Sequence, residues 1–192
     1  MTELKIEPAK TALVVIDLQR GVVSIPAAPR PASEVVQRAA EIARALRRAG
    51  GTIVFVHVTP SADGKDGLKP ITDAAQAAGR ALPPDWAEFV PELGIQPGDI
   101  LITKRQWGAF YGTELDLQVR RRGVDAIILC GISTSVGVES TARDAYERGY
   151  NQIFVEDAMA DRDPERHRHT VSSLFPRIGR VRSTAEVIAA IE

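Results

Sequence analysis

The chain has 192 residues, of which 44% are hydrophobic and 26% charged, and its formal net charge is -1. This length and balance fit a globular protein with one hydrophobic core, so we expect a single domain over residues 1–192. The near-neutral charge and the lack of a long apolar run argue against a nucleic-acid partner, a membrane partner or a secretory signal, and we expect a cytoplasmic protein.

Short apolar runs alternate with amphipathic segments along the chain, as expected for buried strands and surface helices. In chain order, the predicted elements are a strand at 11–17, a helix at 33–50, a strand at 51–58, an irregular segment at 59–98 with a short helix near 85–90, a strand at 99–104, a helix at 113–123, a strand at 125–131, a helix at 135–149, a strand at 151–157, a helix at 164–175, a short strand at 179–183 and a helix at 183–192.

Several helix ends carry their own signals. Ser33 is expected to cap the helix at 33–50, and Gly50 to end it. Asp163 followed by Pro164 is typical of an N-cap and a first helical residue. At the last helix, Ser183 and Glu186 have the spacing of a capping box.

The regular alternation of strands and helices predicts an α/β fold with a parallel sheet and helices on both of its faces. Right-handed crossovers place the carboxyl ends of parallel strands at one edge of the sheet, and ligands bind outside that edge. We therefore expect any functional site to lie where the strands end.

Three features fall at that edge. Asp17 ends the first strand, Lys104 ends the third, and "GISTSVGV" (131–138) leads from the fourth strand into a helix. A carboxylate, an ammonium and the free N–H groups of a helix start can together hold a substrate or move a proton. The same residues also fit a structural salt bridge and a closely packed glycine turn, and spacing alone leaves both interpretations open.

Three stretches of the chain resemble the isochorismatase-like hydrolases of the cysteine hydrolase superfamily. They are "ALVVIDLQRGVV", "GDILITKRQWGAFYGTELDLQVRRRGVDAIILCGISTSVGVESTARDAYERGY" and "VEDAMAD". The resemblance implies a three-layer αβα fold with a six-stranded, mostly parallel, Rossmann-like sheet. It also implies a homodimer or higher homo-oligomer that acts on a small-molecule substrate.

The resemblance further assigns site residues. It implies that Asp17 and Lys104 belong to a catalytic triad whose cysteine position is occupied here by Gly137. It also implies a cis peptide bond between Ile132 and Ser133, with the backbone N–H groups of Ser133 and Gly137 forming an oxyanion hole. We expect substrate to be bound by Gln19, Trp107, Ile132, Ser133 and Thr134, although Gln19 also fits a role in orienting its loop.

Gly137 has no thiol, so the family's usual acyl-enzyme chemistry cannot take place. Isochorismatases in the superfamily also lack the cysteine, which favours hydrolysis of a vinyl ether such as isochorismate, with Asp17 as general acid. Against this, the Ser133–Ser135 segment and "VESTAR" resemble the amidohydrolase branch. Three alternatives remain: hydrolysis of an amide or ester by direct attack of water, an inactive binding or scaffold protein, and a different nucleophile.

Other candidate residues have competing explanations. Cys130, the single cysteine, excludes an internal disulfide and lies within a strand, which favours a small buried hydrophobe over a nucleophile. His57 ends the second strand and either reaches the cleft or caps the strand. In "HRH" (167–169), positions i and i+2 point in different directions, so a solvated helix face is favoured over a metal pair. We expect no metal and no cofactor.

The segment 59–98 is long enough to act as a lid that sets specificity, with Trp86 and Arg80 as candidates. Trp107, Phe110 and Tyr111 follow Lys104 closely. The resemblance implies that aromatic residues here lie near the pocket mouth and at subunit contacts, whereas core packing is the simpler expectation for Phe110.

Overall fold

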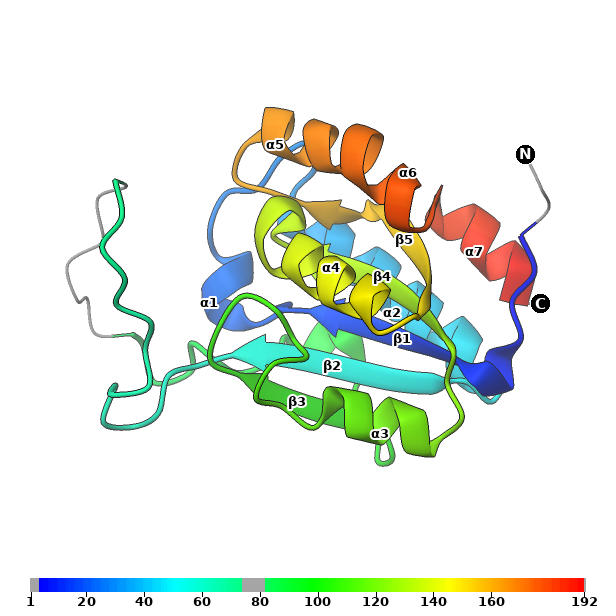
Figure 1. Ribbon diagram of the computed structural model, residues 1–192, viewed down its shortest axis with the longest axis horizontal. Coiled ribbons are helices and arrows are strands. Elements are labelled where there is room, and N and C mark those ends of the chain that lie inside the picture. Colours follow the sequence, from blue (N-terminus) through cyan, green and yellow to red (C-terminus); the bar gives the residue numbers. More distant parts are fainter. Residues whose placement is uncertain (1–3, 74–81, 192) are drawn as a thin grey trace.

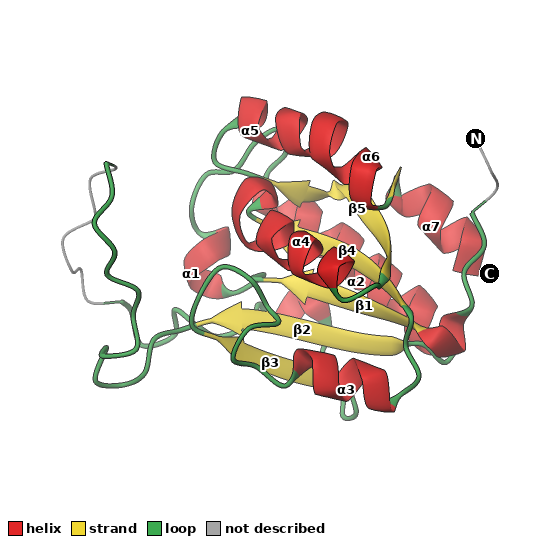
Figure 2. Ribbon diagram, in the orientation of Figure 1, coloured by secondary structure: helices red, strands yellow, loops and turns green. Residues whose placement is uncertain are grey.

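The computed structural model of the protein describes residues 4–73 and 82–191, in which a sheet lies between two layers of helices (Figures 1 and 2). Neighbouring strands are all parallel, in the order β3-β2-β1-β4-β5-β6. The predicted three-layer fold with a six-stranded sheet is therefore confirmed. The strands are β1 (Thr11–Ile16), β2 (Thr52–Val58), β3 (Ile100–Lys104), β4 (Ala126–Ile132), β5 (Asn151–Ala160) and β6 (Arg180–Arg182).

The strand order reverses between β1 and β4, because the chain first builds outward to β3 and then returns to the other side of β1. This is the switch point at which an open parallel sheet leaves a crevice beyond its strand ends. Asp17 follows β1, and the turn that contains Gly137 follows β4. The fold thus brings these two features to the position where the topology favours a site.

The helices cover both faces of the sheet (Figure 1). On one face, α2 packs against α7 and β5, while α4 and α6 contact each other on the opposite face, where α4 also contacts β5. The α-helices are α1 (Arg20–Val23), α2 (Ala32–Arg48), α3 (Leu115–Arg121), α4 (Glu139–Glu147), α5 (Pro164–His169), α6 (Phe175–Ile178) and α7 (Thr184–Ile191). None of the helices in the described part of the chain is long and apolar enough to cross a membrane.

Alternation along β1 explains why the sheet buries both faces. Leu13 and Val15 belong to the core on the α2 side, whereas Val14 and Ile16 belong to the core on the α4 side. Side chains of a strand point alternately to the two faces, so a continuous apolar run fills both cores at once.

Most of the expected helix ends are confirmed. Gly50 has a φ of 84° just after α2, and the side chain of Asp163 accepts a hydrogen bond from the backbone of Glu165. The Ser183 N–H donates to Glu186 Oε2 at 2.8 Å, as a capping box requires. Ser33 is not the cap of α2, because the helix already begins at Ala32, after Pro31.

The predicted helix near 85–90 is wrong. Hydrogen-bonded turns occupy residues 83–88, and a short 3₁₀ helix follows only at Pro91–Leu93. The backbone groups of this segment pair instead with residues 18–21: Arg20 N donates to Glu88 O at 2.8 Å, and Val90 N donates to Leu18 O at 3.3 Å. Because those groups are used across the two segments, they cannot form a helix.

Two further elements differ from the expectation. The predicted helix at 164–175 is divided into α5, a π-helical turn (Thr170–Leu174) and α6. The helix expected at 135–149 begins with another π-helical turn, Thr134–Val138, and continues as α4. Single π turns of this kind are frequent at functional sites.

Candidate active site

Asp17 lies directly after β1 and is almost completely buried. Its φ of 54° is unusual for a residue other than glycine and turns the side chain away from the line of the strand. Oδ2 accepts a hydrogen bond from Lys104 Nζ at 2.8 Å. Oδ1 is also enclosed and has no hydrogen-bond partner within residues 4–73 and 82–191. The carboxyl group therefore has one anchored oxygen and one oxygen without a partner.

Lys104, the last residue of β3, is buried with Asp17. Besides the carboxylate, its ammonium donates to Trp107 O at 2.8 Å and to Gln106 O at 3.1 Å. These three acceptors use all three of the protons on Nζ. We infer that Lys104 holds Asp17 and the 105–107 turn in place and has no proton left to offer to a substrate.

Two opposing influences act on the pKa of Asp17. Burial raises the pKa by disfavouring the charged form, while the adjacent Lys104 and, more weakly, His57 lower it. Burial dominates and raises the pKa of Asp17 from 3.8 to about 6. The group can therefore exist as either acid or carboxylate close to neutral pH, which suits proton transfer.

Gly137 lies in the π-helical turn and faces this pair. A Cβ at position 137 would lie 3.2 Å from Asp17 Oδ2 and 3.4 Å from Lys104 Nζ. The turn is fixed beyond Gly137, since Thr141 Oγ1 donates to the Gly137 carbonyl at 2.7 Å. The three residues that the sequence assigned to catalysis thus come together, with no side chain at the third position.

Comparison with known proteins identifies the family of the chain. The isochorismatase domain family matches residues 11–186. The chain belongs to the isochorismatase family. An uncharacterized isochorismatase family protein of Bacillus subtilis (strain 168) is 51% identical over 193 residues, covering 100% of both chains. A probable isochorismatase of Pseudomonas chlororaphis is 32% identical, covering 98% of this chain and 89% of its own.

A solved structure has the same fold. An isochorismatase family protein from Burkholderia thailandensis superposes with a TM-score of 0.94 and is 43% identical, with 99% of each chain covered.

In this isochorismatase-family protein, Ile132, Ser133 and Thr134 lie at the start of the turn that leads to Gly137. The peptide bond between Ile132 and Ser133 is cis, as the resemblance implies. Thr134 is fully buried, and its hydroxyl lies 2.8 Å from His167 Nδ1. A substrate therefore has no access to the Thr134 side chain in this conformation, and the roles of Ile132, Ser133 and Thr134 in binding remain predictions.

Gln19 connects elements around the site instead of facing an open cavity. It is fully buried, its Nε2 donates to Val58 O at 2.9 Å and to Trp86 O at 3.2 Å, and its Oε1 accepts from Val58 N at 2.8 Å. Both amide protons are used, which favours the loop-orienting role over substrate binding. Trp86 packs its ring against Gly21, where an added Cβ would lie 1.9 Å from the ring.

His57 likewise contacts the segment 83–90 and holds it against the sheet. Its Nδ1 lies 2.7 Å from Ala87 O, its Nε2 lies 2.7 Å from Thr103 Oγ1, and its ring stacks on Phe89. Within the predicted lid, residues 83–90 thus pack beside the site, whereas residues 59–73 extend away from the sheet (Figure 1). Arg80 lies outside the described residues.

Two buried polar residues near the turn were missed by the sequence analysis. His167, expected on a solvated helix face, is 6% exposed and contacts Thr134. Burial lowers the pKa of His167, and the nearby Arg30 lowers it further. Asp161 is 1% exposed and accepts the backbone N–H of Ser135. The only available signal for Asp161 was its place in "VEDAMAD", where a charge ends a buried strand.

The remaining candidates divide between core and surface. Phe110 and Cys130 are buried, and burial raises the pKa of Cys130 to about 12, which keeps its thiol protonated and unreactive. Trp107 and Tyr111 are 64% and 76% exposed, so their side chains are free to meet a ligand or another chain. Within the described residues, no group of three or more His, Cys, Asp or Glu side chains could hold a metal ion.

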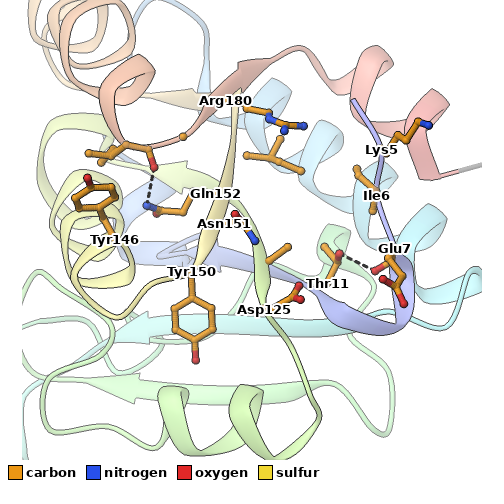
Figure 3. Close-up of a pocket in the computed structure, with 14 residues that line it drawn as sticks. Lys5, Ile6, Glu7, Thr11, Asp125, Tyr146, Tyr150, Asn151, Gln152 and Arg180 are labelled. Carbon is orange, nitrogen blue, oxygen red and sulfur yellow. Dashed lines mark hydrogen bonds between the residues drawn. The ribbon is translucent and has the colours of Figure 1, made fainter. Parts of the chain in front are cut away.

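A separate cavity of about 410 Å³ lies at the other edge of the sheet, where β4, β5 and β6 begin (Figure 3). Gln152 Nε2 donates there to Ile178 O at 3.2 Å, as the dashed line in Figure 3 shows. Lys5 and Arg180, on its rim, are exposed. This cavity includes none of the residues that the sequence assigned to the site.

Proposed function

We propose that the protein hydrolyses a small vinyl ether, with isochorismate as the leading candidate, and that Asp17 is its general acid. The observation that carries this proposal is the carboxyl group of Asp17, which lies beside a position that has no nucleophile. The group has a raised pKa and one oxygen without a partner among the described residues. A protonated carboxyl held in this way has a proton to donate. The family's thiol chemistry cannot start here, because position 137 carries no nucleophile.

The reaction would begin with transfer of the Asp17 proton to the methylene carbon of the vinyl ether. The resulting oxocarbenium ion would be attacked by water, which loses a proton to solvent. The hemiketal would then lose its hydroxyl proton and the ether oxygen would gain one, by way of solvent, as the carbon–oxygen bond to the alcohol breaks. The products would be pyruvate and the alcohol, and Asp17 would regain its proton from solvent. Lys104 would stabilise the carboxylate that forms after the first step, since its ammonium lies 2.8 Å from Oδ2.

The comparisons support this substrate class. The relative from Pseudomonas chlororaphis is described as a probable isochorismatase. The backbone of Gly137 lies directly against Asp17 and Lys104, so a substrate or water bound beside it would contact the acid. Direct attack of water on an amide or ester would use the same residues, but with Asp17 as a base.

The test is release of pyruvate from isochorismate, followed by coupling to lactate dehydrogenase and loss of NADH absorbance. We expect turnover by the wild type, and loss of at least about 100-fold in kcat for Asp17→Asn, because removing a general acid forfeits about 10²–10⁴-fold. Asp125→Asn, an exposed position at the opposite edge of the sheet, should leave turnover unchanged. Absence of pyruvate, or full activity of Asp17→Asn, would refute the proposal.

A further inference from the structure

Asp161 contacts the turn that carries Gly137 through the backbone of Ser135. It follows directly after β5, and its Oδ2 accepts a hydrogen bond from the Ser135 N–H at 2.6 Å. Ser135 is the second residue of the π-helical turn, so its N–H is one of the early donors that a helix cannot satisfy by itself. The carboxylate therefore supplies a partner where the backbone has none.

The carboxylate is itself fixed on several sides. Its Oδ1 accepts from the Arg162 N–H at 2.7 Å. The backbone N–H and carbonyl of Asp161 both pair with Ala28, each at 2.7 Å. Arg30 donates to Met159 O at 2.7 Å and to Glu156 O at 2.9 Å, which ties the end of β5 to the same loop. A carboxylate fixed in this way can determine the position of the turn.

Burial of the Asp161 carboxylate lowers the stability of the fold unless hydrogen bonds compensate the lost hydration. The residue is 1% exposed, and its two carboxylate oxygens accept from the backbone N–H groups of Ser135 and Arg162. One of these two donors, the N–H of Ser135, lies in the first turn of a helix, where a negative charge is favourable. A neutral residue would fill the space without this constraint on Ser135.

We infer that Asp161 is a positioning residue, which keeps Gly137 against the Asp17–Lys104 pair through its hydrogen bond to the Ser135 backbone. The inference rests on the proposed function, because it treats this turn as the place of reaction. Asp161 does not touch the reacting atoms; it determines where the turn lies. Misplacement of catalytic groups by about 1 Å can cost 10²-fold in rate.

A matched control lies on the same strand. Asp157 Oδ1 accepts hydrogen bonds from the N–H and the hydroxyl of Thr184, both at 2.7 Å, at the start of α7, and its Oδ2 pairs with Arg38 of α2. Asp157→Asn and Asp161→Asn make the same change in two carboxylates of β5 and its end. The first alters a helix that lies away from Gly137, and the second alters the turn itself. Ser135→Ala is a second control, because the donor to Asp161 is the backbone and not the hydroxyl.

The first measurement is hydrogen exchange in the peptide that covers residues 133–138. Asp161→Asn should raise exchange at Ser135 and Gly137 by at least about tenfold, because the amide that replaces the carboxylate cannot accept from both N–H groups. Asp157→Asn and Ser135→Ala should leave this peptide unchanged. Unchanged exchange in Asp161→Asn would overturn the inference without reference to any substrate.

The second measurement is the kinetics of pyruvate release. A positioning role predicts that Asp161→Asn lowers kcat by about 10–100-fold while KM and the pH midpoint of Asp17 stay the same. A cap that serves stability alone predicts a lower melting temperature, as in Asp157→Asn, with an unchanged kcat well below melting. The latter result would overturn the inference.

If the wild type releases no pyruvate, the proposed function fails. The alkylation rate of a thiol introduced at position 137 then replaces kcat as the measured quantity. Gly137→Cys would place a thiol beside Asp17, while the native Cys130 stays buried and unreactive. We then expect Asp161→Asn, and not Asp157→Asn, to raise the rate of iodoacetamide alkylation at position 137 by about fivefold, because a loosened turn exposes the thiol. Equal rates in the two backgrounds would overturn the inference.

Discussion

The carboxyl group of Asp17 shows how one residue can combine burial with a neighbouring charge. Burial favours the neutral acid, Lys104 favours the carboxylate, and the outcome is a pKa of about 6. The same pKa has opposite consequences for an acid and for a base. The pH dependence of turnover therefore separates vinyl ether hydrolysis from hydrolysis in which Asp17 activates water.

If Asp17 acts as the acid, kcat/KM should be constant at low pH and should fall about tenfold per pH unit above the pKa of Asp17, as the protonated fraction declines. The measurement is a pH profile of pyruvate release between pH 5 and 8. A rate that rises with pH through the same midpoint would instead assign Asp17 the role of base.

Gly137 offers a second prediction at the residue scale. In Gly137→Ala the added Cβ would lie 3.0 Å from Ile16 Cγ2 and 3.2 Å from Asp17 Oδ2, in the space that we assign to substrate or water. We expect kcat/KM to fall at least tenfold, and the free energy of unfolding to change by less than about 1 kcal/mol, because alanine is the better helix former.

The control for this substitution is Gly67→Ala, where the new Cβ would have a single neighbour, Gly64 O, at 3.6 Å. Activity should be unchanged there. Pyruvate release by Gly137→Ala at the wild-type rate would show that this space is not used.

At the scale of elements, the site depends on how the segment 83–90 is held against residues 18–21. Gln19 is the central contact, because its amide joins the end of β2 to Trp86 through three hydrogen bonds. Phe89 adds a stacked contact with His57. These contacts, made between segments far apart in the sequence, replace the helix that local sequence favoured.

Gln19→Met should therefore lower the free energy of unfolding by about 1–3 kcal/mol, because the hydrogen bonds of the fully buried Gln19 amide are lost and the half-buried Val58 N–H loses its acceptor. Urea denaturation followed by circular dichroism measures the loss. Gln37→Met, on the exposed side of α2, should change stability by less than about 0.5 kcal/mol. Equal effects of the two substitutions would show that the Gln19 contacts do not stabilise the fold.

For the whole molecule, stability depends on the two cores that the sheet separates. Phe175 of α6 stacks on Phe154 of β5 with ring centroids 4.0 Å apart, and both side chains are fully buried. This pair attaches the α5–α6 layer to the sheet on the face that also carries α4. The layer in turn places His167 against the turn at Thr134.

Phe175→Ala should cost about 3–5 kcal/mol in the free energy of unfolding, because it leaves a cavity in a packed core. Phe175→Leu, which keeps most of the volume, should cost clearly less. Both values can be measured by urea denaturation at a fixed pH. A loss below about 1 kcal/mol for Phe175→Ala would mean that the α6 layer is not part of the cooperative core.

The sequence determined the fold class because that depends on periodic patterns that each segment carries locally. The apolar runs, the capping residues Asp163 and Ser183, and the position of Gly50 were sufficient to place most elements. The edge of the sheet that holds Asp17, Lys104 and Gly137 also followed, because parallel strands all end on one side.

The tertiary structure alone decided which polar groups have partners. It showed that Lys104 uses all its protons and that both amide protons of Gln19 are donated, while one oxygen of Asp17 has no partner in the described part of the chain. It also brought Asp161 to Ser135 and His167 to Thr134, contacts that span 26 and 33 residues along the chain. A pattern in one sequence reports local preference and burial, whereas hydrogen-bond partners distant in sequence are fixed only when the elements pack.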